Sequence, residues 1–167
     1  MQLRKLLLVL VAFTAIASSP CAAGQQLRTS NQIKSEFQEH TSEFEAVKAS
    51  LLATESHSFC ITVNHATNYA FVPSAIRLPA KSFESCKKLM KAIDADDVVR
   101  VGNTIRFRIC FKKTGSKLEE QNIVFDAKRE RVVPKKESGV ERVVDDLGAC
   151  WFIVSDQVDL KTFNVNP

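Results

Sequence analysis

The stretch from Val98 to Lys113 constrains the fold of this chain more than any other part of the sequence. Two runs rich in β-branched and aromatic residues flank Gly102-Asn103. A two-residue connection with glycine first is typical of a type II′ turn, whose twist matches that of two paired strands. The sequence therefore predicts a β-hairpin over this stretch.

The second run of the hairpin alternates in polarity. Successive side chains of a strand point to opposite faces, so the apolar set is expected to face a core. That set is Ile105, Phe107, Ile109 and Phe111. The opposite set contains Arg106, Arg108 and Cys110. We therefore expect a second face that is at least partly in contact with solvent.

Residues 1–24 have the three parts of a secretory signal peptide. A basic start precedes an apolar run and a segment of small residues that ends at Gly24. The apolar run is too short to span a bilayer comfortably. We therefore expect residues 25–167 to form a single secreted, extracellular domain without membrane insertion. A lipid-modified Cys21 is the alternative, but the residues before it fit the lipoprotein pattern poorly.

Four cysteines remain after removal of the signal peptide, and they are Cys60, Cys86, Cys110 and Cys150. This number in an exported domain favours two disulfides, with three possible connectivities. Pairing of sequence neighbours closes the shorter loops, so we expect Cys60–Cys86 and Cys110–Cys150. The C-x-x-C and H-x-x-x-H spacings of common zinc sites are absent, so we expect no metal and no cofactor.

Helical periodicity runs through two segments. Between Asn31, as the cap, and about Thr54, apolar residues recur every three or four positions, which predicts an amphipathic helix. Its apolar line is Ile33, Phe37, His40, Phe44, Val47 and Leu51. We expect this helix to pack on the chain's own sheet rather than in a coiled-coil dimer, because the run covers only about three heptads. A shorter helix is predicted from Ser82 to about Ile93, with Cys86 on its apolar side.

The remaining apolar runs predict strands of an antiparallel sheet. They are His57–Asn64, an edge or irregular segment at Asn68–Leu78, Asn122–Phe125, Arg131–Val133, Cys150–Val154 and an edge at Val158–Val165. Thr114–Glu120 is predicted to be a polar loop. The expected fold class is α+β: an antiparallel sheet with one long N-terminal helix packed on it, a second short helix and two disulfides.

The order of these elements resembles the cystatin layout, a long helix followed by antiparallel strands and two disulfides. The segment Val98–Gly102 shares only the valine pair and the final glycine with the inhibitory hairpin of cystatins. Trp151 follows Cys150, whereas proline precedes the corresponding tryptophan in cystatins. The resemblance therefore implies the order of elements only, and no inhibitory residue is carried over.

The charge of the chain argues against binding driven by charge alone. Loss of Arg4 and Lys5 with the signal lowers the net charge from +4 to +2. This value is too near neutral to predict binding to nucleic acid or to an anionic membrane. The charge is uneven, however, because residues 106–136 carry ten basic and four acidic side chains. We expect the acidic C-terminal residues to neutralise this block; the alternative is that it meets an acidic or sulfated partner.

The sequence contains no recognisable catalytic constellation. A G-x-S-x-G elbow and a phosphate-binding glycine loop are absent. His57 and His65 fall on one face of a predicted strand, but eight strand residues separate them by about 26 Å. A site built by the fold from distant carboxylates stays open.

The sequence therefore favours a non-catalytic binding protein that acts on an extracellular protein partner, as an inhibitor or effector. We expect it to be a monomer. The alternatives are a small extracellular hydrolase and a carrier of an apolar ligand. The candidate binding residues are the basic ones of the hairpin and its continuation: Arg106, Arg108, Lys112 and Lys113.

Overall fold

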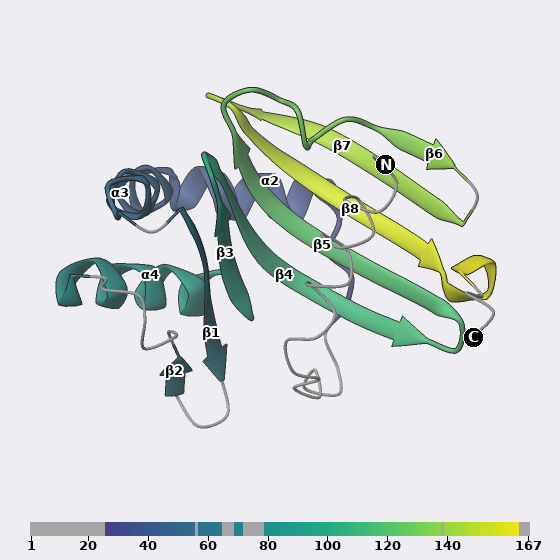
Figure 1. The fold of residues 1–167 in the computed structure, drawn as a ribbon, viewed down its shortest axis with the longest axis horizontal. Coiled ribbons are helices and arrows are strands. Elements are labelled where there is room, and N and C mark those ends of the chain that lie inside the picture. The colour runs from purple at the N-terminus through teal and green to yellow at the C-terminus, as the bar shows by residue number, and fades with distance from the viewer. Residues whose placement is uncertain (1–25, 56, 65–68, 72–78, 138, 164–167) are drawn as a thin grey trace.

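The computed structural model describes residues 26–163 except 56, 65–68, 72–78 and 138. In this part of the chain, three α-helices accompany one antiparallel sheet of eight strands in the order β2-β1-β3-β4-β5-β8-β7-β6 (Figure 1). The predicted α+β class is confirmed. The predicted signal peptide, residues 1–24, lies outside the described residues.

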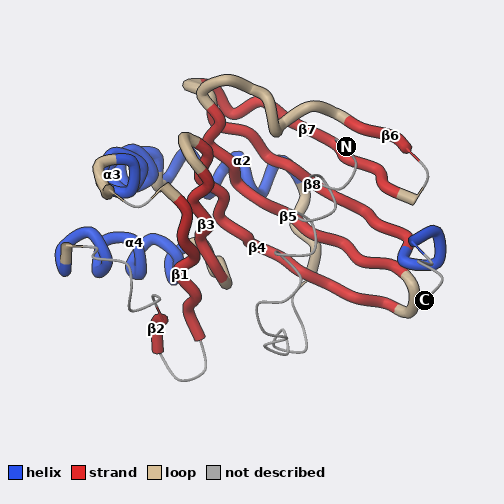
Figure 2. The backbone as a smooth tube through the Cα atoms, viewed as in Figure 1, coloured by secondary structure: helices blue, strands red, loops and turns tan. Residues whose placement is uncertain are grey.

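The elements follow one another along the chain, and Figure 2 shows their strands as one curved layer. They are α2 (Ser30–Glu39), α3 (Thr41–Leu52), β1 (Ser58–Asn64), β2 (Tyr69–Phe71), α4 (Ala80–Ala92), β3 (Asp97–Val101), β4 (Thr104–Thr114), β5 (Lys117–Asp126), β6 (Lys135–Glu137), β7 (Val140–Gly148), β8 (Trp151–Asp159) and the 3-10 helix η1 (Leu160–Phe163).

The predicted hairpin is formed by β3 and β4. Val101 pairs with Thr104, so Gly102 and Asn103 make a two-residue turn. Gly102 has a φ of +62°, whereas Asn103 does not have a positive φ. A positive φ at the first turn residue alone is the signature of type II′. The hairpin is confirmed.

The long N-terminal helix is in fact two helices. The cap of α2 is Thr29 rather than Asn31, since Thr29 and Gln32 exchange side-chain and backbone hydrogen bonds in a capping box. His40, with φ of −111° and ψ of 19°, interrupts the helix before α3 begins. The predicted apolar line survives the break, because Ile33, Phe37, Phe44, Val47 and Leu51 are all buried.

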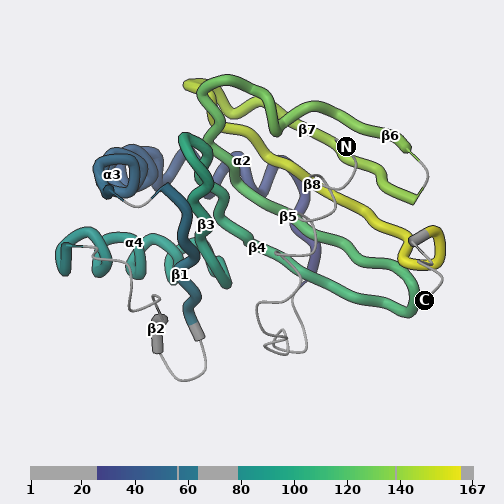
Figure 3. Tube along the Cα trace, in the orientation of Figure 1, coloured from purple at the N-terminus to yellow at the C-terminus, as the bar shows by residue number. Residues whose placement is uncertain are grey.

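Trp151 is at the centre of the core between the helices and the sheet. Four phenylalanine rings from α2, α3, β4 and β5 surround it with ring centroids at 5.2–6.2 Å: Phe37, Phe44, Phe107 and Phe125. Its indole Nε1 donates a 2.7 Å hydrogen bond to Glu45 Oε1. Figure 3 shows that the early α2 and the late strand β7 lie side by side, and Ser30 Oγ donates to Asp145 Oδ2 across this contact.

Arg100 on β3 ties the end of α3 to the sheet. Its side chain is almost fully buried, and its Nη1 donates to the carbonyl oxygens of Leu51 and Thr54 at 2.5 and 3.0 Å. The last carbonyls of a helix have no partner within the helix, and a cation is favoured there by the helix dipole. The apolar face of the sheet thus includes one charged residue that caps a helix.

A β-bulge in β4 changes the predicted faces. The register with β5 shifts between Arg108 and Cys110, so that Cys110 pairs with Gln121 and Phe111 with Glu120. One extra residue moves every following side chain to the opposite face. Cys110 therefore lies on the core side and Phe111 on the arginine side, the reverse of the prediction. The guanidinium of Arg108 lies 5.1 Å from the centre of the Phe111 ring.

The predicted disulfides are not formed, since none of Cys60, Cys86, Cys110 and Cys150 is bonded to another cysteine. Cys60 lies on the face of β1 opposite its buried Phe59 and Ile61, whereas Cys86 is buried among the helices on the other side. The sheet therefore separates the first pair. Cys110 pairs with Gln121, four residues along β5 from the partner of Trp151. About 13 Å along the strands and two strand spacings thus separate Cys110 from Cys150, beyond the reach of a disulfide.

The predicted polar loop at Thr114–Glu120 is also wrong. Thr114 pairs with Lys117, so β4 and β5 form a long hairpin with a turn at Gly115 and Ser116. The charges that suggested a loop lie on paired strands, where Lys112 is opposite Glu119. The predicted strand at Asn122–Phe125 is part of β5, and most of the predicted segment Asn68–Leu78 lies outside the described residues.

Candidate functional site

The face of the sheet opposite the helices, here called the outer face, carries several charged residues of the strands. Strand register places Asp97, Arg108, Asn122 and Val154 in one cross-strand row over β3, β4, β5 and β8. The next row contains Phe111, Glu120, Asp156 and Arg142. Neighbouring rows lie about two residues apart along a strand, so these polar side chains form one patch.

Four residues of this patch form a network of ion pairs, the charge cluster, made up of Asp97, Arg106, Arg108 and Glu120. Arg108 Nη2 lies 2.5 Å from Asp97 Oδ2. Arg106 connects the two acids, with Nη1 at 3.1 Å from Glu120 Oε1 and Nη2 at 3.9 Å from Asp97 Oδ1. Two carboxylates and two guanidiniums make the cluster formally neutral.

The charge cluster is poorly exposed. The side chain of Asp97 is 7% exposed, and those of Arg106 and Arg108 are each 24% exposed. Burial raises the pKa of Asp97, and the two arginines act against that rise. Burial also raises the pKa of the neighbouring Cys60 thiol, and the charge of Asp97 adds to the effect. Cys60 is therefore a poor nucleophile at neutral pH.

A second ion pair extends the patch across the sheet. Arg142 on β7 holds Asp156 on β8 with two hydrogen bonds of 2.6 and 2.8 Å, and the bonds raise the pKa of Arg142. Arg142 also donates to the carbonyl oxygen of Arg131, in the segment that joins β5 to β6. From this segment Val132 packs on the apolar side chains Val124, Phe152 and Val154 of the outer face. The apolar part of the outer face on β5 and β8 is thus covered by the segment that joins β5 to β6.

The four predicted binding residues do not form one surface. Arg106 and Arg108 are held in the charge cluster by acids of the same chain. Lys112 and Lys113 are exposed beyond the bulge, and because they are consecutive on a strand they lie on opposite faces. The structure therefore separates the arginines from the lysines.

The exposed lysines gather at one end of the sheet, which we call the lysine end: Lys112, Lys113, Lys117 and Lys161. The first three flank the β4–β5 turn, and η1, which carries Lys161, lies beside that turn because Leu160 N donates to Ser116 O at 2.7 Å (Figure 1). All four are exposed, and no ion pair is recorded for them among the described residues.

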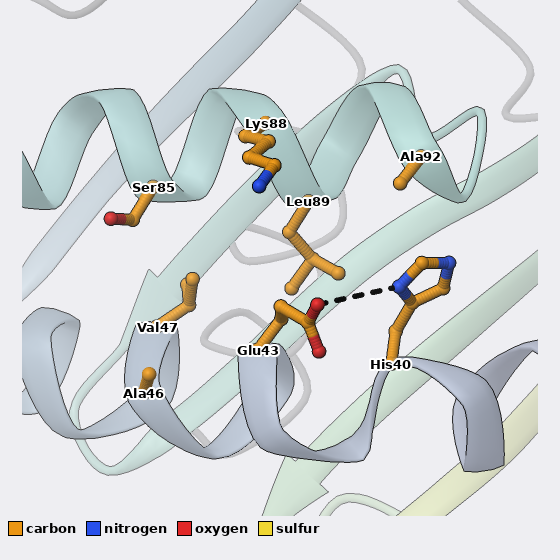
Figure 4. Close-up of a pocket in the computed structure, with 8 residues that line it drawn as sticks. All are labelled: His40, Glu43, Ala46, Val47, Ser85, Lys88, Leu89 and Ala92. Atoms are coloured by element: carbon orange, nitrogen blue, oxygen red, sulfur yellow. Dashed lines mark ion pairs between the residues drawn. The ribbon is translucent and has the colours of Figure 1, made fainter.

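A groove of about 190 Å³ lies between α3 and α4 (Figure 4). His40 and Glu43 face each other at its edge, with His40 Nδ1 at 3.8 Å from Glu43 Oε1. Its remaining lining residues are Ala46, Val47, Ser85, Lys88, Leu89 and Ala92. The groove is smaller than the roughly 300 Å³ at which ligand pockets begin. It does not provide the closed cavity that a carrier of an apolar ligand would need.

Within the described residues, no three side chains of His, Cys, Asp or Glu are grouped to hold a metal ion. None of the described helices is long and apolar enough to cross a membrane. Of the two histidines of the predicted strand, His57 has its Nδ1 at 3.3 Å from Arg100 Nη2, and His65 lies outside the described residues.

Comparison with models of known protein families, with curated proteins and with solved structures finds no match to this chain. The fold and the geometry of the outer face are therefore the basis for any functional proposal.

Sequence reasoning missed the acidic half of the charge cluster. The predicted hairpin began at Val98, one residue too late to include Asp97, although Asp97 alternates with Val99 and Val101 on β3. Glu120 was assigned to a loop, and Asn122 to a short strand without a role. Both follow the alternation of β5 once its true start at Lys117 is known. The alternation of residues along the two strands thus indicated which face the acids occupy. It could be read only from the correct starts of β3 and β5, and the many charged residues at these starts did not suggest strands.

Proposed function

We propose that this chain is an exported, non-catalytic binding protein that engages an acidic protein partner through the lysine end. The proposal includes removal of residues 1–24 as a signal peptide. The observation that carries it is the gathering of four exposed lysines at one end of the sheet. Such a local field attracts an acidic surface even where the net charge is small.

The charge cluster is a less suitable surface for an acidic partner than the lysine end. Arg106 and Arg108 are already engaged by Asp97 and Glu120, and an acidic partner would have to displace those carboxylates. Lys112 and Lys113 require no such exchange. The sequence-based proposal of a basic binding surface is therefore kept for the two lysines, extended to Lys117 and Lys161, and dropped for the two arginines.

The test is binding of the purified protein to immobilised poly-L-glutamate, an acidic polypeptide probe. The double variant Lys112→Glu/Lys113→Glu should bind about tenfold more weakly at low salt, because two attractive charges become repulsive. The matched control is Lys81→Glu/Lys128→Glu, which reverses two exposed lysines outside the lysine end. Equal weakening by both pairs would show that only net charge matters, and would overturn the proposed surface.

A further inference from the structure

A cross-strand row of aliphatic side chains, here called the apolar row, lies on the outer face next to the lysine end. Leu118 on β5 lies opposite Val158 on β8, and Val158 lies opposite Val140 on β7. Each is two residues along its strand from a charged residue of the outer face, so all three side chains point to that face. The apolar row thus continues the outer face beyond its ion pairs.

The apolar row is not part of either hydrophobic core. Its three side chains are half-buried, and neither core cluster of the described residues includes any of them. Leu160, at the start of η1, follows Val158 by two residues and is one of four large apolar side chains that are exposed in the described part of the chain. A group of apolar side chains at the surface, bordered by charge, is typical of a site of interaction with another protein.

Lysines border the apolar row on the side of the lysine end (Figure 1). Lys113 on β4 lies directly opposite Leu118 and completes the row there. Lys117 precedes Leu118, and Lys161 follows Leu160. Apolar and positively charged side chains therefore alternate at this end of the sheet.

The charges at the other end of the apolar row pair with each other. Val140 lies opposite Glu137 on β6, and Lys135 Nζ lies 2.8 Å from Glu137 Oε2. The positive field over the row is therefore concentrated at the lysine end. Such a field favours a partner whose carboxylates lie beside the groups that contact the apolar row.

We infer that the apolar row and the lysine end together bind a protein segment in which apolar side chains adjoin carboxylates. The apolar side chains of the segment pack on Leu118, Val158 and Val140, and its carboxylates meet the neighbouring lysines. This inference rests on the proposed function and adds the source of its specificity. Charge attracts any acidic partner, whereas burial of apolar surface selects among acidic partners.

The experiment compares two peptides of equal charge, Glu-Glu-Leu-Val-Leu-Glu-Glu and Glu-Glu-Ser-Thr-Ser-Glu-Glu, by fluorescence anisotropy at low salt. The protein should bind the leucine peptide about tenfold more tightly, because only its side chains remove apolar surface of the row from water. Equal affinity for the two peptides would overturn the inference and leave the lysine end as a surface that recognises charge alone. Binding of neither peptide would instead reject the proposed function, and this inference with it.

A pair of isosteric variants assigns the preference to the apolar row. Val140→Thr/Val158→Thr replaces one methyl group by a hydroxyl in each side chain and keeps the β-branched shape that strands favour. It should bind the serine peptide unchanged, and its preference for the leucine peptide should fall from about tenfold to about twofold. The matched control is Val133→Thr/Val143→Thr, the same change in two exposed valines outside the row. A preference that persists in the row variant, or that the control also loses, would overturn the inference, and Leu118→Gln decides if the row variant does not fold.

Two other occupants of the apolar row would give different results. Binding to vesicles that contain phosphatidylglycerol, lost in Val140→Thr/Val158→Thr, would assign the row to an anionic membrane. A dimer in analytical ultracentrifugation that dissociates in the same variant would assign it to a second copy of the chain. Either result would overturn the inference of an acidic protein segment.

Discussion

Single side chains fasten the helices to the sheet, and Glu45 does so beside the aromatic core. It accepts a hydrogen bond from Trp151 Nε1 and pairs with Lys48, whose ammonium group lies 4.7 Å from the centre of the Phe125 ring. Burial acts to raise the pKa of Glu45, but the bonds from Lys48 and Trp151 outweigh it, so the pKa lies below its ordinary value. The charged form of Glu45 is therefore the one that stabilises the fold.

This direction sets a pH dependence of stability. A carboxyl group with a lowered pKa stabilises the folded state above its unfolded pKa, here about 4.5, and loses that contribution as the pH falls through the folded value. Glu45→Gln should cost about 0.5–1 kcal/mol at pH 7, a modest value because the side chain is partly exposed. Urea unfolding at pH 7 and at about pH 3 should show this difference shrinking in acid. A difference that is constant with pH would mean that the charge of Glu45 plays no part.

At the scale of elements, the β7–β8 hairpin contains a strained turn. Gly148 pairs with Trp151, so Ala149 and Cys150 form a two-residue turn, and their φ angles are +50° and +65°. Two positive φ angles define a type I′ turn, which asparagine and glycine adopt with least strain. Ala149→Gly should therefore stabilise the protein by about 1 kcal/mol in thermal or urea unfolding. Ala127→Gly is the matched control, because Ala127 is exposed without a positive φ and glycine there only adds flexibility.

The elements also show which parts of the sequence were informative. The β3–β4 hairpin and the apolar lines of the helices were predicted, because each depends on local periodicity that burial then satisfies. The break at His40, the bulge at Ile109 and the long β4–β5 hairpin were not. They depend on pairing between strands and on packing of one helix over the sheet, which no single segment specifies. The bulge alone moved Cys110 and Phe111 to unexpected faces.

The candidate site was predicted only in part, for a related reason. Its arginines were identified from their position on a strand, but their acidic partners come from two other strands. Only the sheet order brings Asp97, Arg108 and Asn122 into one row. The basic block of the sequence is therefore divided in the structure. Two of its arginines belong to the poorly exposed, formally neutral charge cluster, and three of its lysines belong to the exposed lysine end.

At the scale of the whole molecule, the positions of the cysteines allow no predicted disulfide, so the fold is held together by packing. The core cluster spans all three α-helices and strands β1, β3, β4, β5 and β8, so packing rather than covalent bonds joins these elements. Cys86 is completely buried in that cluster, and burial raises the pKa of its thiol to about 12. Cys110 is also fully buried. Neither thiol is available to a reagent in water while the fold is intact, since alkylation needs an accessible thiolate.

The corresponding prediction is a difference between folded and unfolded protein on treatment with iodoacetamide. Intact mass spectrometry under native conditions should show Cys86 and Cys110 unmodified, and in denaturant without reductant all four thiols from Cys60 to Cys150 should be alkylated. Cys86→Ala should remain folded but lose about 1–3 kcal/mol, because a buried sulfur is replaced by a smaller group in a packed core. A mass that shows fewer than four reactive thiols after unfolding would mean that disulfides form, and the strand register that keeps Cys60 from Cys86 and Cys110 from Cys150 would then be wrong.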